Sequence, residues 1–581
     1  MNTATQTPMM QQSLAIKAEY PDIYLFYRMG DFYEFFFQDA VEVAELLHLT
    51  LTSRSKSDPN PIPMAGVPAH AVDNYLAKLI KMGKSVAICD QVGLPSEQKG
   101  PMKREVTRIV TPGTISEESL LNEQQDSILA CIHSAASIGL AYCDITNGSF
   151  TVMTLADNTV LQNELARLNP REILINEDFQ PPDWLSQHPQ LRQRPPWDFN
   201  TDTATRTLTE QCQTKDLQGF GCAGMPEAIG AGGALLQYLK YTQKSAIPHI
   251  RHINTMTVSD AIVLDACTRA NLELTHNLRG GREHTLASIM DKTKTPMGSR
   301  LLQRWLHRPI KDIQSKQNRL DAITSCIDHG HDAIPTALKG MGDIERICAR
   351  IALRSVKPKD FVQLRTALAK LPLLIADCAK LKNKLFGHLS KACTGFEGLT
   401  ETLMKAIEEN PPVTIRDGGV IAAGYQQELD ELRQLSQHAG QFLIDLETQE
   451  RQTTGIASLK VGYNRIHGYF IEISKGQSSS TPDHYIRRQT LKNAERYITP
   501  ELKAFEEKAI SAKTQALALE KKVFDGLIGT CLSQLNALQT MSQSVATIDV
   551  LSNLAERAVS LNWHRPTLTE NTGIMIKQGR H

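Results

Sequence analysis

The sequence predicts a multidomain protein that has mixed α/β structure in its N-terminal part and is mostly α-helical after about residue 255. Three observations predict this class. The 581 residues suffice for about four domains. Up to residue 245, runs of β-forming residues alternate with helical stretches. Beyond that point apolar residues recur at helical spacing, and Pro and Gly mark the loops.

The composition is that of an ordinary soluble protein, with 41% hydrophobic and 22% charged residues. No apolar stretch is long enough for a membrane span, and the N-terminus is not a signal peptide. The eleven cysteines are scattered, which predicts reduced thiols in a cytoplasm, without disulfides or a metal site. Lys plus Arg and Asp plus Glu both number 63, so any affinity for nucleic acid must come from a local patch.

The first 115 residues predict a compact α/β unit. Thr7-Pro8 opens a helix, and "IYLFYRM" (23–29) is a strand that ends at Gly30. Asp31 is expected to cap a helix through about Leu47. The remaining elements follow in order: a strand "LTLTSR" (49–54), a proline-rich loop (57–68), a helix (69–82), a strand "SVAICDQV" (85–92) and a last strand within "KREVTRIVTPGT" (103–114).

An aromatic run, "RMGDFYEFFFQDA" (28–40), raises the first functional question. Helical periodicity from Asp31 predicts that most of its rings belong to the core. Phe32, however, is expected at a strand–helix junction, where a side chain can project outward. An apolar ring held there beside an acid can wedge between stacked bases.

Residues 117–245 predict a second α/β domain, with strands "SILACI", "IGLAYCDIT" and "SFTVMTL" and a helix at "LQNELARL". Within the helical part, two segments carry heptad seams and predict an antiparallel arm on the order of 40 Å long. Thr499-Pro500 starts its second helix. The seams are Tyr425, Leu429, Leu432, Ser436, Ala439, Leu443 and Leu446, and Leu502, Phe505, Ala509, Ala512, Ala516, Leu519 and Val523.

The tip of the arm is predicted to be a β-hairpin, because residues 459–474 alternate apolar and polar types around Asn464–Gly468. The charge changes sign there, from a net −5 over residues 426–450 to a net +5 over residues 451–496. The tip is either a solvated mixed-charge loop or a phosphate-binding patch, and composition leaves both interpretations open. Its donors are Arg487, Arg488, Lys492, Asn493 and Arg496.

Catalytic motifs are missing from the sequence. Gly83-Lys84-Ser85 resembles the end of a phosphate-binding loop, but Lys78 stands where that loop needs its first glycine, and a helix precedes it where a strand should. No complete GxxxxGK[ST], HExxH or GxSxG pattern occurs. The sequence therefore predicts no catalytic residues, no metal site and no cofactor site.

Long motifs in chain order resemble the bacterial MutS mismatch-repair proteins. They are "FYRMGDFYEFF", "PIPMAGVPAHAVDNYLAKLIKMGKSVAICDQV", "NLEL" (271–274), "DKTKTPMGSRLLQRWLHRPI" (291–310), "GYNRIHGYFIEIS" and "RRQTLKNAERYITPEL". The resemblance implies six segments: a mismatch-recognition domain (1–115), a ribonuclease-H-like connector (116–250), a helical lever core (251–420), a clamp arm (421–528) with a β tip (457–498), returning core helices (529–565) and the start of an ATPase domain (566–581).

The resemblance also implies the site residues. Phe32 is expected to be the intercalating wedge and Glu34 its base-contacting partner, with Phe35–Phe37 in the core. The tip of the arm is expected to hold the DNA backbone. The backbone contacts expected there are Lys460, Arg465, Lys475, Arg487, Arg488, Lys492, Asn493 and Arg496; weaker candidates near the wedge are Arg54, His70, Arg104 and Arg108.

The implied function is recognition of mismatches or small loops in double-stranded DNA, in a cytoplasmic, nucleoid-associated protein. The family forms homodimers, works with a MutL-type partner and hydrolyses ATP with magnesium in a domain that the chain is expected to lack, since it ends at "GIMIKQGRH". The chain itself is therefore expected to be no enzyme. The alternative is a helical interaction scaffold that does not bind DNA, from which a steep salt dependence of binding would distinguish the first hypothesis.

Overall fold

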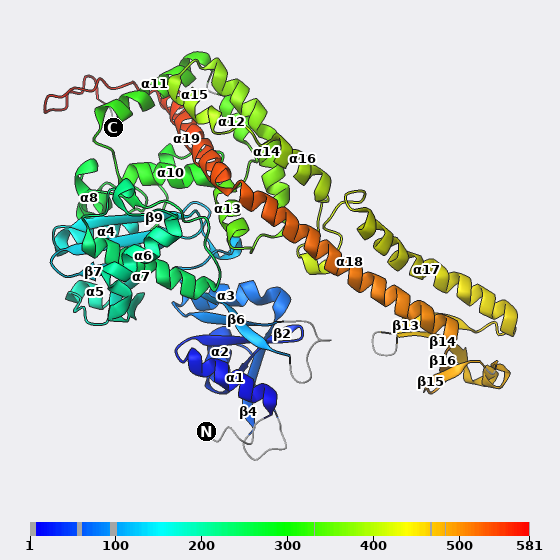
Figure 1. The fold of residues 1–581 in the computed structure, drawn as a ribbon. Helices are drawn as coiled ribbons and strands as arrows, with labels where there is room; N and C mark the ends of the chain where they lie inside the picture. The colour runs from blue at the N-terminus through cyan, green and yellow to red at the C-terminus, as the bar shows by residue number, and fades with distance from the viewer. Residues whose placement is uncertain are drawn as a thin grey trace. The chain divides into compact units, whose positions relative to one another are not determined.

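A computed structural model describes residues 7–54, 61–92, 102–330, 332–464, 468–482 and 484–579. The chain divides into two units, which we describe separately (Figure 1). The first unit contains residues 1–356, 366–395 and 534–581, and the second contains residues 357–365 and 396–533. Residues 396–420, which the sequence assigned to the lever, thus belong to the same unit as the arm. The architecture is multidomain, with two α/β parts followed by a mostly helical part.

The first sheet has the strand order β3-β4-β2-β1-β5-β6. Helices α2 and α3 cover one face, where Phe26, Tyr33 and Phe35 are buried, and α1 covers part of the other face through Met10. The elements are α1 (Pro8–Glu19), β1 (Tyr24–Met29), β2 (Phe32–Phe36), α2 (Phe37–Leu47), β3 (Thr52–Arg54), β4 (Ile62–Pro68), α3 (Val72–Lys81), β5 (Val86–Gln91) and β6 (Arg104–Val110).

Two predictions for this sheet were wrong. The aromatic run is the strand β2, and the helix begins only at Phe37, so Asp31 does not cap it. Ile62–Pro68, predicted to be loop, is the strand β4 that pairs with β2. Gly30 adopts a left-handed backbone and closes a two-residue turn, since Met29 pairs directly with Phe32. The turn directs the chain straight back along β1, so the aromatic residues alternate between the two faces of a strand.

The second sheet has the order β11-β10-β7-β8-β9-β12. Strands β7, β8 and β9 form an antiparallel meander, and β10 and β11 extend it in parallel, as a ribonuclease-H-like connector requires. Helix α7 lies against the sheet. The backbone of Glu227 in α7 approaches Gly139 of β8 so closely that a side chain with a Cβ atom would not fit at position 139. The elements are β7 (Ile128–Ser134), β8 (Ile138–Asp144), β9 (Ser149–Leu155), α4 (Asn158–Leu168), β10 (Glu172–Asn176), α5 (Asp183–Ser186), β11 (Leu191–Arg194), α6 (Thr201–Cys212), α7 (Pro226–Gln243) and β12 (Asn254–Thr255).

The helical rest of the first unit is organised around α19 (Leu535–Ser560). Buried Asp549 of α19 accepts hydrogen bonds from the backbone amides of Lys294 and Thr295 and from the Thr295 hydroxyl, which fixes the start of α10. The other helices are α8 (Ala266–Asn271), α9 (Leu286–Met290), α10 (Pro296–His307), α11 (Ile313–His329), α12 (Ala333–Leu338), α13 (Ile344–Ala352) and α15 (Lys384–Lys391); α14 (Pro358–Lys380) runs from one unit into the other.

The second unit contains the arm, in which α17 (Gln427–Thr454) and α18 (Pro500–Ser533) run side by side (Figure 1). The seam residues Leu429, Leu446 and Leu502 are buried, and α18 continues past residue 528, the expected end of the arm. The tip is a four-stranded antiparallel sheet of order β13-β14-β16-β15, and the predicted hairpin is its β13–β14 pair. The remaining elements are α16 (Glu397–Ala406), β13 (Lys460–Asn464), β14 (Gly468–Ser474), β15 (Ile486–Thr490) and β16 (Ala494–Ile498).

Across the described ranges, the helices are all too short or too polar to span a lipid bilayer. The same ranges contain no cluster of three or more His, Cys, Asp or Glu side chains placed to hold a metal ion. All eleven cysteines lie in the described ranges; none of them forms a disulfide bond, and ten are at least partly buried.

Candidate nucleic-acid interface

Phe32 is the one ring of its run that faces solvent. It begins β2, directly after the Gly30 turn, and its side chain is 47% exposed, whereas Phe35 is fully buried. Tyr33 and Phe36 are buried as well, and Phe37 is partly buried. The difference follows from the strand geometry, because residues two apart share a face. Phe32 and Glu34 therefore lie on one face of the sheet, while Tyr33 and Phe35 point into the core under α2 and α3.

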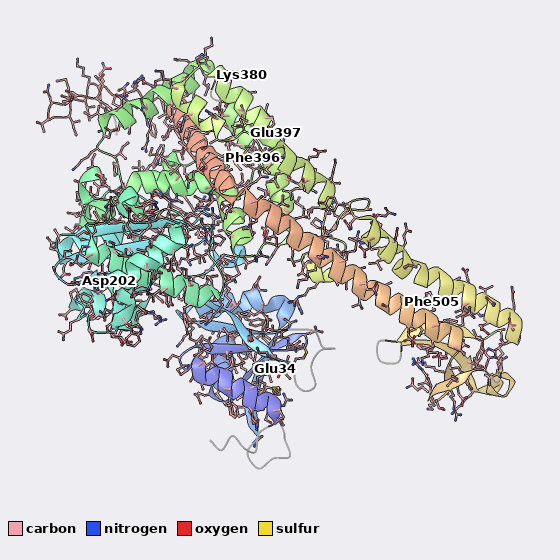
Figure 2. The ribbon with its side chains drawn as sticks, viewed as in Figure 1. Glu34, Asp202, Lys380, Phe396, Glu397 and Phe505 are labelled. Carbon is pink, nitrogen blue, oxygen red and sulfur yellow. The ribbon has the colours of Figure 1, made fainter. Side chains whose placement is uncertain are left out.

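Glu34, which is labelled in Figure 2, follows on the same face of the strand as Phe32. Its side chain is only partly exposed. Its Oε2 atom is buried and makes no hydrogen bond to any described residue. The nearest cationic atom, Arg54 Nη1, lies 3.9 Å away, which is too far for a hydrogen bond. Burial raises the pKa of Glu34, and the positive charges of Arg54 and Arg104 oppose that rise. A partly dehydrated carboxyl group thus remains available to a ligand.

Gly66 of β4 pairs with Glu34 and was not predicted as part of the site. A Cβ atom there would lie 3.6 Å from Glu34 Cγ and 3.8 Å from Phe32 Cδ1, so glycine leaves the surface between these two side chains open. A glycine inside a strand often marks a close approach of a ligand or of another backbone. The "MAGVP" stretch contained that signal, but its interpretation as a loop hid it.

The four weaker candidates near the wedge fall into two pairs. Arg54 lies beside Glu34 and is partly exposed, and His70 is exposed just after Pro68, the residue that pairs with Phe32. Arg104 does not fit the expectation: it is 8% exposed, stacks over the Tyr27 ring and donates to the Arg28 carbonyl oxygen.

Arg108 is also occupied within the protein. It is mostly buried and forms an ion pair with Glu117 at 2.6 Å. The sequence could not reveal either environment, because each depends on a side chain from another part of the fold. For both Arg104 and Arg108 the structure supports a stabilising role in the domain and not a contact with phosphate.

The tip sheet presents exposed donors near one end. Lys475 and Asn493 are adjacent, since the Lys475 amide donates to the Asn493 carbonyl oxygen, and Lys492 is exposed beside them. Lys460 is exposed on β13. Flexible, hydrated ammonium groups and amides of this kind bind phosphate oxygens without reading base sequence. Arg465 lies outside the described residues.

The three arginines of the tip each have an acidic neighbour. Arg496 binds Glu472 at 2.9 Å and lies 4.0 Å from the centre of the Phe470 ring, so it is largely enclosed. Arg487 and Arg488 are both exposed, with Glu495 3.7 Å from Arg487 and Glu506 3.7 Å from Arg488. The sequence predicted that Arg496 belongs to a phosphate-binding patch, but its contacts with Glu472 and Phe470 do not support a role in holding phosphate. Figure 2 shows Phe505 on α18 next to this sheet, where it packs against Tyr469.

Comparison with protein families identifies the domains. The family model of MutS domain I matches residues 7–119, that of MutS domain II matches residues 126–251, and that of MutS domain III matches residues 267–555. The three matches follow one another along the chain and cover most of it. Together they imply a role in mismatch recognition during DNA repair, with mismatched DNA as the kind of partner. The chain belongs to the MutS family of DNA mismatch-repair proteins.

Proposed function

We propose that this protein recognises a mismatch by inserting the ring of Phe32 into the base stack and kinking the duplex. The observation that carries this proposal is the exposure of Phe32 on a strand whose other rings are partly or fully buried. A wedge of this kind costs a few kcal/mol of base unstacking. A mismatched step has already lost part of its stacking and pairing, so it is deformed at a lower cost. Discrimination then reflects how easily the duplex bends.

Glu34 sharpens the discrimination in this proposal. A carboxylate close to DNA phosphates weakens binding to any duplex, unless a displaced base forms a hydrogen bond with it. The part of the Glu34 side chain that is exposed and the open surface over Gly66 support such a contact. A matched duplex supplies no displaced base, so the Glu34 carboxylate only repels its phosphates.

The tip of the arm supplies affinity that does not depend on sequence. Lys460, Lys475, Lys492 and Asn493 are the exposed donors that support this part of the proposal. Arg487 and Arg488 join them by exchanging an acidic neighbour for a phosphate, which reduces their net contribution.

Substitution of Phe32 tests the proposal. In the 581-residue chain, Phe32→Ala should reduce the preference for mismatched over matched duplex by about 1–3 kcal/mol, the value of one base–aromatic stacking contact. Fluorescence anisotropy titrations with the two duplexes measure this preference. Trp197→Ala is the matched control, since it removes an aromatic ring that is 71% exposed on another domain. Retained discrimination in Phe32→Ala, with normal affinity for both duplexes, would refute the wedge.

ATP turnover is proposed to lie outside these 581 residues. The GKS stretch stands between α3 and β5, so a helix leads into it and a strand follows, the reverse of a phosphate-binding loop. ATP hydrolysis that scales with the concentration of the purified chain would contradict this. The homodimer and the MutL-type partner that the family resemblance implies are likewise proposals, which sedimentation and pull-down measurements test.

A further inference from the structure

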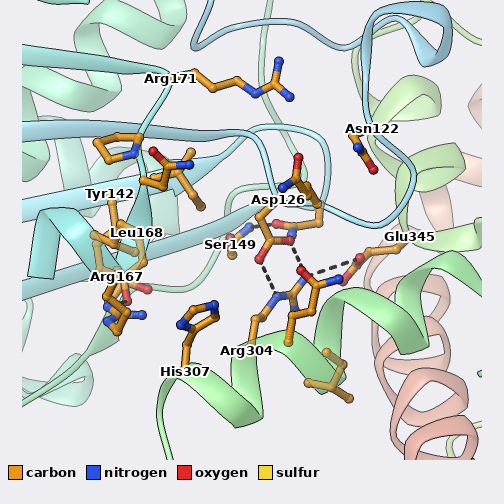
Figure 3. A pocket seen from close by; sticks show the side chains of 18 of the residues that line it. Asn122, Asp126, Tyr142, Ser149, Arg167, Leu168, Arg171, Arg304, His307 and Glu345 are labelled. Carbon is orange, nitrogen blue, oxygen red and sulfur yellow. Dashed lines mark hydrogen bonds and ion pairs between the residues drawn. The ribbon is translucent and has the colours of Figure 1, made fainter. Parts of the chain in front are cut away.

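The first unit contains a cavity of about 1780 Å³ that the proposed function does not use. Its walls come from the connector sheet and from helices α4, α8, α10 and α19 (Figure 3). Ligand pockets usually measure about 300–1,000 Å³, so this space can hold a small molecule together with water. It lies away from Phe32 and Glu34, neither of which lines it.

The charge of the walls is strongly positive. Eight Lys and Arg side chains line the cavity among the described residues, against two carboxylates, Asp126 and Glu345. Both carboxylates are already neutralised: Asp126 binds Arg304 at 2.8 Å, and Glu345 binds Arg300 at 2.6 Å. Figure 3 shows the Asp126–Arg304 bonds at one side of the cavity. Arg167 and Arg308 also have acidic neighbours, Glu164 at 2.7 Å and Asp260 at 4.0 Å, but the lining as a whole still carries more cations than carboxylates.

Two unused hydrogen-bonding groups are concentrated at one part of the wall. Arg269 Nε and His307 Nδ1 are buried and make no hydrogen bond within the described parts of the chain. His307 Nε2 lies 3.0 Å from the Thr275 hydroxyl; when it accepts from that group, Nδ1 carries the proton and can donate into the cavity. A buried polar group without a partner is costly, so each of these two groups favours a nearby acceptor.

The titration of His307 reports the same positive surroundings. Burial, together with the neighbouring charges of Arg269, Arg167 and His276, lowers its pKa to about 4. On the connector side, Arg171 is half-buried before β10, and burial lowers its pKa although buried Asp144 opposes the change. An anion in the cavity would compensate the desolvated guanidinium groups of Arg269 and Arg171 and accept a hydrogen bond from the neutral His307 ring.

We propose that this cavity is a binding site for a small polyanion that bears phosphoryl groups, held by Arg269, His307 and Arg171. Guanidinium groups suit this ligand class because their fork of N–H donors matches the oxygens of a phosphoryl group. Two cationic walls suit a ligand with two or more such groups. Since α8, α10 and the connector each contribute a ligand-binding residue, the anion would also bind the folded form selectively and raise its melting temperature.

Calorimetric titration of the full chain with inorganic pyrophosphate, at constant ionic strength, tests this proposal. Saturable binding is expected, and both Arg269→Gln and Arg171→Gln should weaken it by about tenfold, the effect of losing one charge-assisted hydrogen bond. Arg206→Gln is the matched control, because Arg206 is exposed on α6 and does not line the cavity. Melting curves confirm that each variant folds, and Arg171→Gln carries the test if Arg269→Gln does not.

Two further arms identify the source of the phosphoryl groups. If ATP binds no more tightly than pyrophosphate, the site recognises the phosphoryl groups alone. If ATP binds more tightly and Arg269→Gln removes this binding, the site also contacts the nucleoside part of the ligand. Absence of saturable pyrophosphate binding overturns the proposal, as does equal weakening in Arg206→Gln. Binding of duplex DNA that requires Arg269, without binding of pyrophosphate, also overturns it.

Discussion

The first sheet and the tip sheet both carry an aromatic ring and a carboxylate on an outer face, but the two pairs of side chains differ in exposure and in their hydrogen bonds. In the first sheet Phe32 is exposed and Glu34 Oε2 has no hydrogen bond among the described residues. In the tip sheet Phe470 is buried under Arg496, which is itself bound to Glu472. The first surface is left unsatisfied, and the second is satisfied internally.

This difference indicates how the two regions contribute to binding. An unsatisfied surface gains the full effect of a new contact, so it can distinguish one DNA structure from another. An arginine that already binds an acid at hydrogen-bond distance, as Arg496 binds Glu472, gains only the difference between two ion pairs, and in water that difference is small. We therefore expect the first sheet to govern discrimination, and the exposed lysines of the tip to govern general affinity.

The largest expected effect separates two rings of one strand. Phe35→Ala should lower the free energy of unfolding of its domain by about 3–5 kcal/mol, because Phe35 is fully buried against Phe26. Phe32→Ala, at an exposed position, should change it by less than about 1 kcal/mol. Urea denaturation of both variants measures the two changes. A large loss in Phe32→Ala would place that ring in the core and remove the contrast on which the account rests.

The second prediction concerns the tip lysines. Replacing Lys460, Lys475 and Lys492 with Gln should reduce the slope of log affinity against log salt by about 2–3, since each phosphate contact contributes about 1. Matched and mismatched duplexes should lose affinity equally, because phosphates carry no sequence information. Lys513, Lys521 and Lys522, exposed on α18, provide a triple control with the same charge change. A loss confined to mismatched DNA would show that the tip reads the lesion.

The smallest expected effect is that of Glu34→Gln. Removal of the negative charge should raise affinity for matched duplex several-fold, by about 1 kcal/mol, and so narrow the discrimination. A fall in pH should change the affinity for matched duplex in the same direction as Glu34→Gln does, because protonation also removes the negative charge. Because burial raises the folded-state pKa of Glu34, its carboxyl group takes up a proton at a higher pH than a solvated glutamate does, and binding of the matched duplex should strengthen as the pH falls.

Glu34→Gln should abolish that pH dependence, which titrations of both proteins from pH 7.5 to about 5 would reveal. The variant serves as its own control for other titrating groups, since these remain in place. An identical pH profile in the two proteins would show that the charge of Glu34 does not act on the matched duplex.

Sequence periodicity predicted the helices and most strands correctly, but it misplaced the aromatic run. Its rings satisfied helical spacing, and only the Gly30 turn and pairing with β4 made it a strand. Phe32 was nevertheless expected to face outward, because the residue next to a turn is freer than those inside an element. Arg104 is enclosed by Tyr27, which lies far away in the sequence. Arg496 is enclosed by Glu472, which lies on the neighbouring strand. No local sequence pattern encodes either contact.

The most direct test of the wedge measures base unstacking itself. A duplex with 2-aminopurine beside a mismatch fluoresces more strongly when that base is unstacked. Saturation with the unsubstituted chain should raise the fluorescence of the mismatched duplex and leave that of the matched duplex unchanged. Phe32→Ala, at concentrations that saturate the same duplex, should produce no rise. An equal rise with Phe32→Ala would contradict the account, since the base would then be unstacked without the ring.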